Sequence, residues 1–210
     1  MTAAGAAARP RPAARRRSGA GARATRAATA PAAGTAQRGP WLETLRLALR
    51  EFGPGDVDDI YRLDRDPRVI RHIVGLKPAT RDEAASTLRR IMRYYRLYPE
   101  LGAWHATRRD TGRFIGWFSL KYAGESPDIE IGYRLVPEAW GQGFATEGAT
   151  ALLNFGFDEL GLHRIIGVTD RGNRASQKVL LKAGLEDRGW GDYYDCRLRL
   201  FAADNPHRAT

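Results

Sequence analysis

The sequence predicts one α/β (mixed α+β) domain, built around a central, twisted, mostly antiparallel sheet with helices on both faces. Residues 45–50 alternate apolar and polar side chains, which is the two-residue period of a half-buried strand. Residues 101–136 contain three strand-like runs joined by short polar turns. From residue 140 onward, a glycine-rich loop leads into a helix, a strand, a second helix and two final strands. A meander followed by alternating helices and strands is typical of a mixed sheet.

The predicted domain opens with a strand over Trp41–Phe52, in which leucines alternate with arginine and alanine. A Gly-Pro-Gly turn follows, and Asp56 is a natural N-cap for a short helix. Two prolines then make the stretch 67–78 irregular. This part should therefore contribute one strand and one short helix.

A longer helix is predicted after Thr80. Thr80 and Glu83 have the spacing of a capping box, and apolar side chains recur at helical spacing until Pro99. The turn at Arg109–Gly112 joins the first two strands of a meander. The meander strands are Leu101–Thr107, Phe114–Tyr122 and Ile129–Val136.

The second half of the domain alternates helices and strands. The helix after the glycine-rich loop is expected to end at Gly161, because glycine readily takes the left-handed conformation found just past helix ends. Asn173 is the N-cap candidate of the next helix, which stops at Gly184. The remaining elements are the strand Arg164–Thr169, the helix Arg174–Ala183 and strands near Leu185–Trp190 and Tyr194–Phe201.

The chain of 210 residues suits one ordinary domain, and its charge is unevenly distributed. Residues 1–40 contain eight arginines and no acidic residue, so the remainder holds 26 basic against 24 acidic residues. This Ala/Arg/Pro/Gly-rich tail has too few large apolar side chains to offset the entropy of ordering, which predicts disorder. An arm that contacts RNA or another anionic surface is the alternative. Residues 41–210 form the predicted domain.

Composition also limits the compartment and the cofactors. Cys196 is the single cysteine, so an internal disulfide is excluded, and no apolar run is long enough for a membrane span. We therefore expect a cytoplasmic protein. His72, His105 and His163 are not spaced as a metal-binding set, and no metal is predicted.

Residues 140–146, Trp-Gly-Gln-Gly-Phe-Ala-Thr, form the glycine-rich loop. At a helix N-terminus, free backbone N–H groups and the helix dipole favour a phosphate or pyrophosphate. The two glycines allow close approach to the backbone, whereas a P-loop Lys-Ser/Thr and a complete G-x-G-x-x-G are both missing. The loop therefore predicts a pyrophosphate held mainly by backbone amides.

Four separated segments of the chain resemble the GNAT acetyltransferases in order and spacing, over residues 41–201. They include GYRLVPEAWGQGFATEGATALLNFGFDELGLHRI, DRGNRASQKVLLKAGL and, upstream, WLETLRLALREFGPGDVDDIYRLDRDPRVIRHI. Within that superfamily they are similar to the Rim-type (RimJ/RimL-like) branch of ribosomal-protein N-terminal acetyltransferases. The pyrophosphate loop of the superfamily reads Gln/Arg-x-x-Gly-x-Gly/Ala. Trp140 stands at its first position, which departs from the general pattern but is usual in the Rim-like branch.

The resemblance implies a GNAT-like fold, with acetyl-CoA as the acyl-donor cosubstrate and no metal. Leu135 and Val136 should pair through their backbones with the pantetheine arm, which Asn173 should also hydrogen-bond. Ser176 should lie near the thioester sulfur. The pyrophosphate should be held by the loop residues Trp140, Gly141, Gln142, Gly143, Phe144, Ala145 and Thr146.

The general acid of the resembling enzymes has no obvious counterpart. Many GNAT enzymes carry a tyrosine one turn after Ser176 to protonate the leaving thiolate, and this chain has Leu180 there. Ser176, water or direct departure of the thiolate would then replace it. Ordinary structural roles remain open for both polar residues, with Asn173 as a helix N-cap and Ser176 in a first helical turn.

Glu130 is the candidate base, because an alkylammonium must lose its proton before it attacks at neutral pH. Its strand alternates polar and apolar side chains, which places Glu130 on the polar face a few residues before Leu135. A salt bridge with Arg134 is the alternative role of this carboxylate. Trp104 and Trp117, on meander strands, are candidates for the lining of the acceptor pocket.

The resulting hypothesis is an N-acetyltransferase that transfers the acetyl group by direct attack of a primary amine. The Rim-like resemblance favours a protein N-terminal amine of ribosomal-protein type as the acceptor, and the resembling proteins are often dimers. A small amine such as an antibiotic, a polyamine or an amino acid is the alternative, because function depends on the site and not on the fold. A non-catalytic RNA- or ribosome-binding protein that acts through its arginine-rich tail is the alternative of another class.

Overall fold

The computed structural model describes residues 41–73 and 75–207. In this part of the chain, eight strands form one sheet in the order β1-β2-β3-β4-β5-β6-β8-β7. Paired strands are antiparallel except β5 and β6, which run parallel. The mixed, mostly antiparallel sheet expected from the sequence is confirmed. The predicted tail lies outside the described residues, so its separation from the domain stays a prediction.

The order of helices and strands also follows the sequence prediction closely. The strands are β1 (Leu42–Glu43), β2 (Leu47–Glu51), β3 (Gly102–Arg108), β4 (Phe114–Tyr122), β5 (Ile129–Leu135), β6 (Arg164–Thr169), β7 (Glu186–Tyr193) and β8 (Cys196–Asp204). The α-helices are α1 (Val57–Asp64), α2 (Pro67–Ile70), α3 (Arg81–Leu97), α4 (Phe144–Asp158) and α5 (Arg174–Ala183). Short 3-10 turns cover Pro54–Asp56 and Pro137–Ala139.

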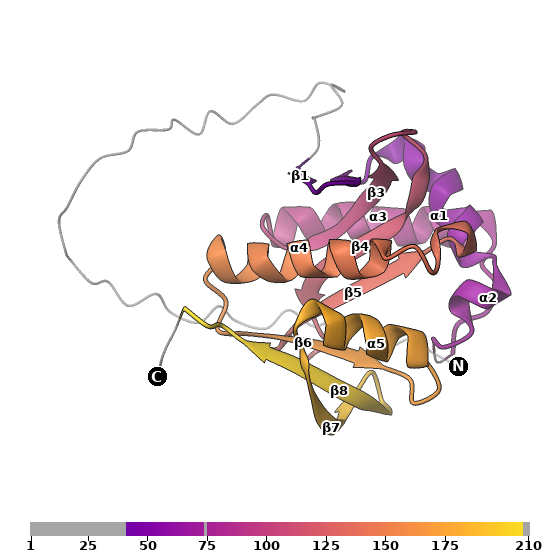
Figure 1. Cartoon of the computed structure of the whole chain (residues 1–210). Helices are drawn as coiled ribbons and strands as arrows, with labels where there is room; N and C mark the ends of the chain where they lie inside the picture. Colours follow the sequence, from indigo (N-terminus) through magenta and orange to yellow (C-terminus); the bar gives the residue numbers. More distant parts are fainter. Residues whose placement is uncertain (1–40, 74, 208–210) are drawn as a thin grey trace, which may run out of the picture. The chain divides into compact units, whose positions relative to one another are not determined.

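Helices cover both faces of the sheet (Figure 1). The larger core cluster joins α4 to the sheet and includes Phe118 of β4 and Leu152 of α4, both fully buried. A smaller cluster on the other face packs Ile60 of α1 against Leu88 of α3. A Cβ added at Gly148 would lie 2.3 Å from the Phe118 ring, so α4 approaches β4 as closely as a glycine permits. The sheet therefore separates α4 and α5, on one face, from α1 and α3, on the other.

The first predicted strand is wrong in one respect, because Trp41–Phe52 folds as a hairpin of β1 and β2. The Thr44 hydroxyl accepts a hydrogen bond from the Leu47 N–H at 2.9 Å and closes the turn. Leu45, which fitted the apolar alternation, lies in this turn and is 86% exposed. The hairpin brings Trp41 onto Trp104, where the two rings stack with their centroids 4.2 Å apart.

Two helix starts differ from expectation and one agrees. The Asp56 side chain makes no cap bond to α1 and instead accepts hydrogen bonds from Arg50 and the Gly53 N–H. Helix α2 lies in the stretch expected to be irregular, because Asp66 caps it. The capping box of Thr80 and Glu83 at α3 is confirmed.

Candidate functional site

Strands β5 and β6 diverge, and this divergence defines the candidate site. They are joined at a single pair, Glu130 with Ile166, whereas β5 pairs with β4 along its whole length. Beyond this pair, β5 runs on to Leu135 and β6 to Thr169 without further pairing in the described structure. Unpaired strand edges present backbone N–H and C=O groups that can pair with an extended ligand.

The end of β5 offers fewer free backbone groups than the sequence suggested. The Val136 N–H donates to the Ile115 carbonyl at 2.9 Å, so it points toward β4 and is already bound. Because backbone groups alternate in direction along a strand, the N–H of Leu135 points toward the β6 side. The Leu135 carbonyl accepts the Trp140 indole N–H at 2.8 Å. Two residues were expected to contact the pantetheine through their backbones. Of their two N–H groups, only that of Leu135 faces the divergence and takes part in neither of these bonds.

The glycine-rich loop has the shape expected of an anion site. Gly141 and Gly143 have positive φ angles of 73° and 83°, which glycine adopts without strain. The last three loop residues, from Phe144 to Thr146, form the first turn of α4, and Gly143 is its N-cap without a side-chain cap bond. The first N–H groups of a helix have no partner within it, so these amides are available to a phosphate. A Cβ at Gly141 would meet nothing within 4 Å, which leaves room for a ligand.

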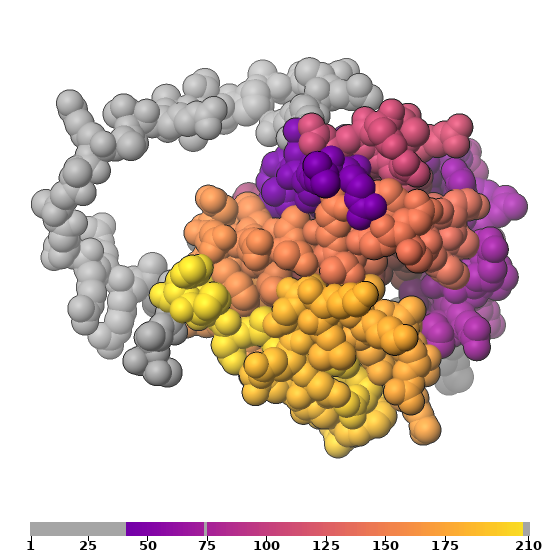
Figure 2. Space-filling view, in the orientation of Figure 1, coloured from indigo at the N-terminus to yellow at the C-terminus, as the bar shows by residue number. Residues whose placement is uncertain are grey.

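The β1–β2 hairpin contacts the glycine-rich loop through Arg46, which the sequence did not suggest. Arg46 donates to the Glu147 carboxylate at 2.6 Å and to the Gln142 carbonyl at 2.9 Å. Its guanidinium also lies 4.4 Å from the centre of the Phe144 ring. The hairpin, in indigo, lies against the start of the orange α4 segment in Figure 2.

Glu147 places a negative charge close to the expected pyrophosphate. Burial tends to raise its pKa, but hydrogen bonds from Thr44 and Arg46 outweigh this and hold the pKa below its usual range. An ionised carboxylate in the first helical turn stabilises the helix, yet it would repel a bound phosphate. Arg46 pairs with that charge and also donates a hydrogen bond to the Gln142 carbonyl.

Replacing Arg46 by alanine is expected to weaken coenzyme A binding about tenfold, the upper range for a charge at a helix terminus. Isothermal titration calorimetry with coenzyme A measures this. Arg90→Ala, at an exposed position on α3, is the matched control and should bind as the wild type does. The double variant Arg46→Ala/Glu147→Gln should recover most of the loss. Unchanged affinity in Arg46→Ala would rule out this role.

The start of α5 faces β5 through a pair of hydroxyl groups. The Asn173 side chain caps the helix by accepting the Ser176 N–H at 3.1 Å, which confirms the predicted cap. The Ser176 hydroxyl lies 2.9 Å from the Tyr133 hydroxyl of β5. Burial raises the pKa of Tyr133 to about 12, so its hydroxyl stays protonated at neutral pH. The serine expected near the thioester therefore has a protonated tyrosine beside it.

Glu130 lies on the face of the sheet opposite to Tyr133, where a hydroxyl and an ammonium group contact its carboxylate. Its residue is 8% exposed, and its Oε2 accepts the Tyr194 hydroxyl and lies 3.5 Å from the Lys121 ammonium. The salt bridge with Arg134, which was the alternative role of Glu130, is not formed, because Arg134 pairs with Asp64 of α1. Glu130 is thus a shielded carboxylate at the base of the β5–β6 divergence.

The family comparison decides the identity of this arrangement. The model of a family described as an acetyltransferase (GNAT) domain matches residues 46–186 of the chain. The chain belongs to the GNAT acetyltransferases. It is therefore an acyltransferase, with acetyl-CoA as its cosubstrate. The diverging strands, the open glycine-rich loop and the uncapped start of α4 are the features of this enzyme that fit the cosubstrate.

Relatives of this GNAT acetyltransferase include proteins with different acceptors in their names. FsC-acetyl coenzyme A-N(2)-transacetylase of Aspergillus fumigatus is 35% identical over 159 residues, which cover 72% of this chain and 67% of that protein. The N-acetyltransferase YoaA of Bacillus subtilis is 36% identical over 153 residues, covering 71% and 85%. The solved structure of RimL, a ribosomal alpha-N-protein acetyltransferase in complex with coenzyme A, shares the fold. It has a TM-score of 0.65 at 14% identity and covers 77% of this chain and 95% of that one.

Besides Arg46 and Glu147 at the glycine-rich loop, sequence reasoning missed Lys121, Tyr133 and Tyr194 in the candidate site. Tyr133 stands among the apolar residues of its strand, and Tyr194 lies 64 residues from Glu130 in the chain. No local pattern joins such distant positions. Trp104, expected as a pocket residue, is 3% exposed and belongs to the core, so that expectation is wrong.

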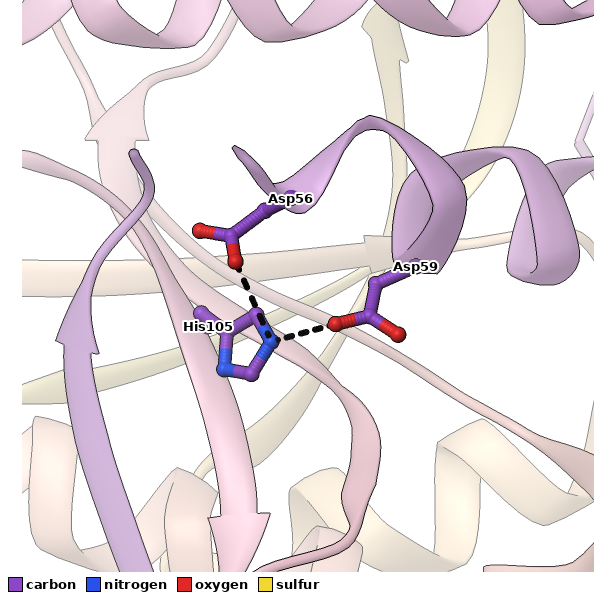
Figure 3. Close-up of side chains that lie close together, drawn as sticks. All are labelled: Asp56, Asp59 and His105. Atoms are coloured by element: carbon purple, nitrogen blue, oxygen red, sulfur yellow. Dashed lines mark hydrogen bonds and ion pairs between the residues drawn. The ribbon is translucent and has the colours of Figure 1, made fainter. Parts of the chain in front are cut away.

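A group of two carboxylates and a histidine lies apart from this site, between α1 and β3 (Figure 3). Nε2 of His105 lies 2.8 Å from an Asp59 oxygen and 4.0 Å from an Asp56 oxygen. Such a cluster could in principle bind a metal. Both oxygens of Asp56 already accept hydrogen bonds from Arg50, at 2.7 and 2.8 Å. The cluster is better explained as a charge network that anchors the start of α1.

Among the helices of residues 41–73 and 75–207, none is long and apolar enough to cross a membrane. The cytoplasmic location stays a prediction.

Proposed function

We propose that this GNAT enzyme acetylates the primary amine of a small molecule at the point where β5 and β6 separate. The observation that carries the proposal is the shielded Glu130 carboxylate at the last pair before the divergence. A base at that point can take a proton from an amine that approaches the end of an extended ligand between the strands. A small acceptor is supported by the 35% identical relative, whose name assigns acetylation of N(2) of FsC.

Acetyl-CoA supplies an activated acetyl group as a thioester, and the residues on the cofactor side fit its parts. The amides of residues 141–146 and the α4 N-terminus are suited to the pyrophosphate. The Leu135 N–H is the backbone donor that remains to polarise a carbonyl, as an oxyanion-hole amide does. Asn173 caps α5 at the edge of the same region.

Proton movement can be assigned to Glu130 and to the pair of Ser176 and Tyr133. Glu130 accepts the proton of the acceptor ammonium, directly or through water, because the neutral amine is the nucleophile. To Ser176, whose hydroxyl lies 2.9 Å from that of the protonated Tyr133, we assign the relay of a proton to the leaving thiolate. This pair takes the place of the tyrosine that many GNAT enzymes have at the position of Leu180. A thiolate is only weakly basic, with a pKa of about 8.5, so it can leave before it is protonated. The proton that it then takes up is the second one that the attacking nitrogen releases.

A protein N-terminus is the second candidate acceptor. It is favoured by the Rim-like sequence run around the glycine-rich loop and by the shared fold of RimL. The likeness to RimL supports the fold alone, so we place this acceptor after the small amine. A homodimer, implied by the same resemblance, also remains a proposal.

Coenzyme A release from acetyl-CoA tests the proposal with the full chain. We expect turnover with small primary amines, among polyamines, amino acids and amino sugars, at a kcat/KM at least about tenfold above that for short peptides. The peptides begin with Ala, Ser or Met. Preference for peptides would favour the second candidate. Absence of turnover on every amine, despite coenzyme A binding, would contradict both acceptor classes.

A further inference from the structure

The turn between β7 and β8 has an unusual backbone. Tyr194 and Asp195 both have left-handed conformations, with φ angles of 56° and 57°. Two-residue hairpin turns of this kind normally carry Asn or Gly, because larger side chains are strained there. A tyrosine in this conformation indicates that other interactions of its side chain compensate the strain.

The Tyr194 side chain is engaged at the candidate base. Its hydroxyl donates to the Glu130 carboxylate and accepts a hydrogen bond from the Lys121 ammonium at 3.0 Å. The neighbouring Tyr193 hydroxyl donates to Asp128 at 2.8 Å, just before β5 begins, and so fixes the same hairpin. Burial and the charge of Glu130 raise the pKa of Tyr194, which keeps the hydroxyl protonated as a donor.

Lys121 already makes the contacts that an acceptor ammonium needs. Its Nζ lies 3.5 Å from the Glu130 carboxylate, 3.0 Å from the Tyr194 hydroxyl and 5.3 Å from the centre of the Tyr194 ring. A carboxylate, a hydroxyl and an aromatic face are the groups that recognise alkylammonium ions. The Lys121 side chain is 34% exposed and Tyr194 is 46% exposed, so solvent reaches the ammonium from outside.

We propose that Glu130 and Tyr194 form the subsite for the ammonium group of the acceptor, and that Lys121 occupies this subsite until the acceptor displaces it. The proposal rests on the proposed function, and it narrows the acceptor to an unhindered alkylammonium. Displacement costs little, because a partly exposed ion pair contributes little net stability. Once Lys121 has moved out, the acceptor nitrogen lies beside the carboxylate that accepts its proton.

Three variants test the subsite in the full chain. Lys121→Met empties it, so the KM for an alkylamine should fall about fivefold. Tyr194→Leu removes the ring and the hydroxyl and should raise that KM about tenfold. Tyr194→Phe keeps the ring and should change it by about threefold or less. The KM for acetyl-CoA should stay unchanged in all three, and Lys182→Met, at an exposed position on α5, is the control for loss of a lysine.

Binding of n-butylammonium, measured by calorimetry without acetyl-CoA, separates the subsite from catalysis. Tighter binding to Lys121→Met than to the wild type supports the subsite, even if no amine is turned over and the proposed function fails. Equal or weaker binding to Lys121→Met, with an unchanged melting temperature, overturns it. An equal loss in Tyr194→Phe and Tyr194→Leu would also overturn it, because the aromatic face would then have no role.

Discussion

Glu130→Gln is expected to lower kcat by at least about a hundredfold at neutral pH, the lower range for loss of a general base. Glutamine keeps the size of the side chain and can still accept the Tyr194 hydroxyl, so the local packing should survive. It cannot take a proton from the acceptor ammonium. Initial rates of coenzyme A release measure the effect, with coenzyme A affinity checked by calorimetry.

The pH profile distinguishes a base from a merely structural carboxylate. An alkylammonium loses its own proton near pH 10, so the Glu130→Gln rate should approach the wild-type rate as the pH rises toward that value. Asp128→Asn is the matched control, since Asp128 is a nearby carboxylate that accepts the other tyrosine of the hairpin. Retention of more than about a tenth of kcat in Glu130→Gln would remove Glu130 from the mechanism.

Gly116→Ala is expected to destabilise the fold by about 3 kcal/mol or more, from backbone strain and steric overlap together. Gly116 has a φ angle of 140°, and an added Cβ would lie 2.1 Å from the Arg134 carbonyl oxygen. That atom belongs to the backbone of β5, so a side-chain rotation cannot relieve the overlap. The melting temperature should fall by about 10 °C, as followed by circular dichroism.

Gly112→Ala separates the two contributions. Gly112 also has a positive φ, 66°, but a Cβ there would meet nothing within 4 Å. It should therefore cost only about 1 kcal/mol, which is the strain alone. Similar losses in the two variants would show that the close approach of β4 to β5 is not what requires glycine at Gly116.

Elements set by local sequence could be predicted well. The glycine-rich loop, the capping box of α3 and the Asn173 cap depend on residues a few positions apart, and the structure contains each of them. The break between β1 and β2 could not be found this way, because the apolar alternation continues through Leu45. The turn that Thr44 and Leu47 close is also held by the bonding of Thr44 and Arg46 to Glu147, about a hundred residues away.

The same limit explains what was missed at the candidate site. Sequence reasoning placed Glu130 on the polar face of its strand, and it lies there. Its partners could not be predicted, because Tyr194 belongs to a hairpin that is distant in the sequence. Arg134, which is near in the sequence, forms its salt bridge with Asp64 of α1. Likewise, sequence reasoning could not tell that the Val136 N–H, expected to contact the pantetheine, binds β4 instead. The contact expected from Leu135 stays a prediction.

The single pair between β5 and β6 also bears on how the domain folds. On either side of it, β1 to β5 and β6 to β8 form two ladders that are each continuous in the described structure. Main-chain bonding thus couples the two parts weakly, and their cooperativity depends on the shared core, where Phe118 of β4 belongs to one cluster with Ile165 of β6 and Leu180 of α5. The two ladders are therefore docked onto each other mainly through side chains. An extended ligand between β5 and β6 would then link two units that the chain itself leaves almost unjoined.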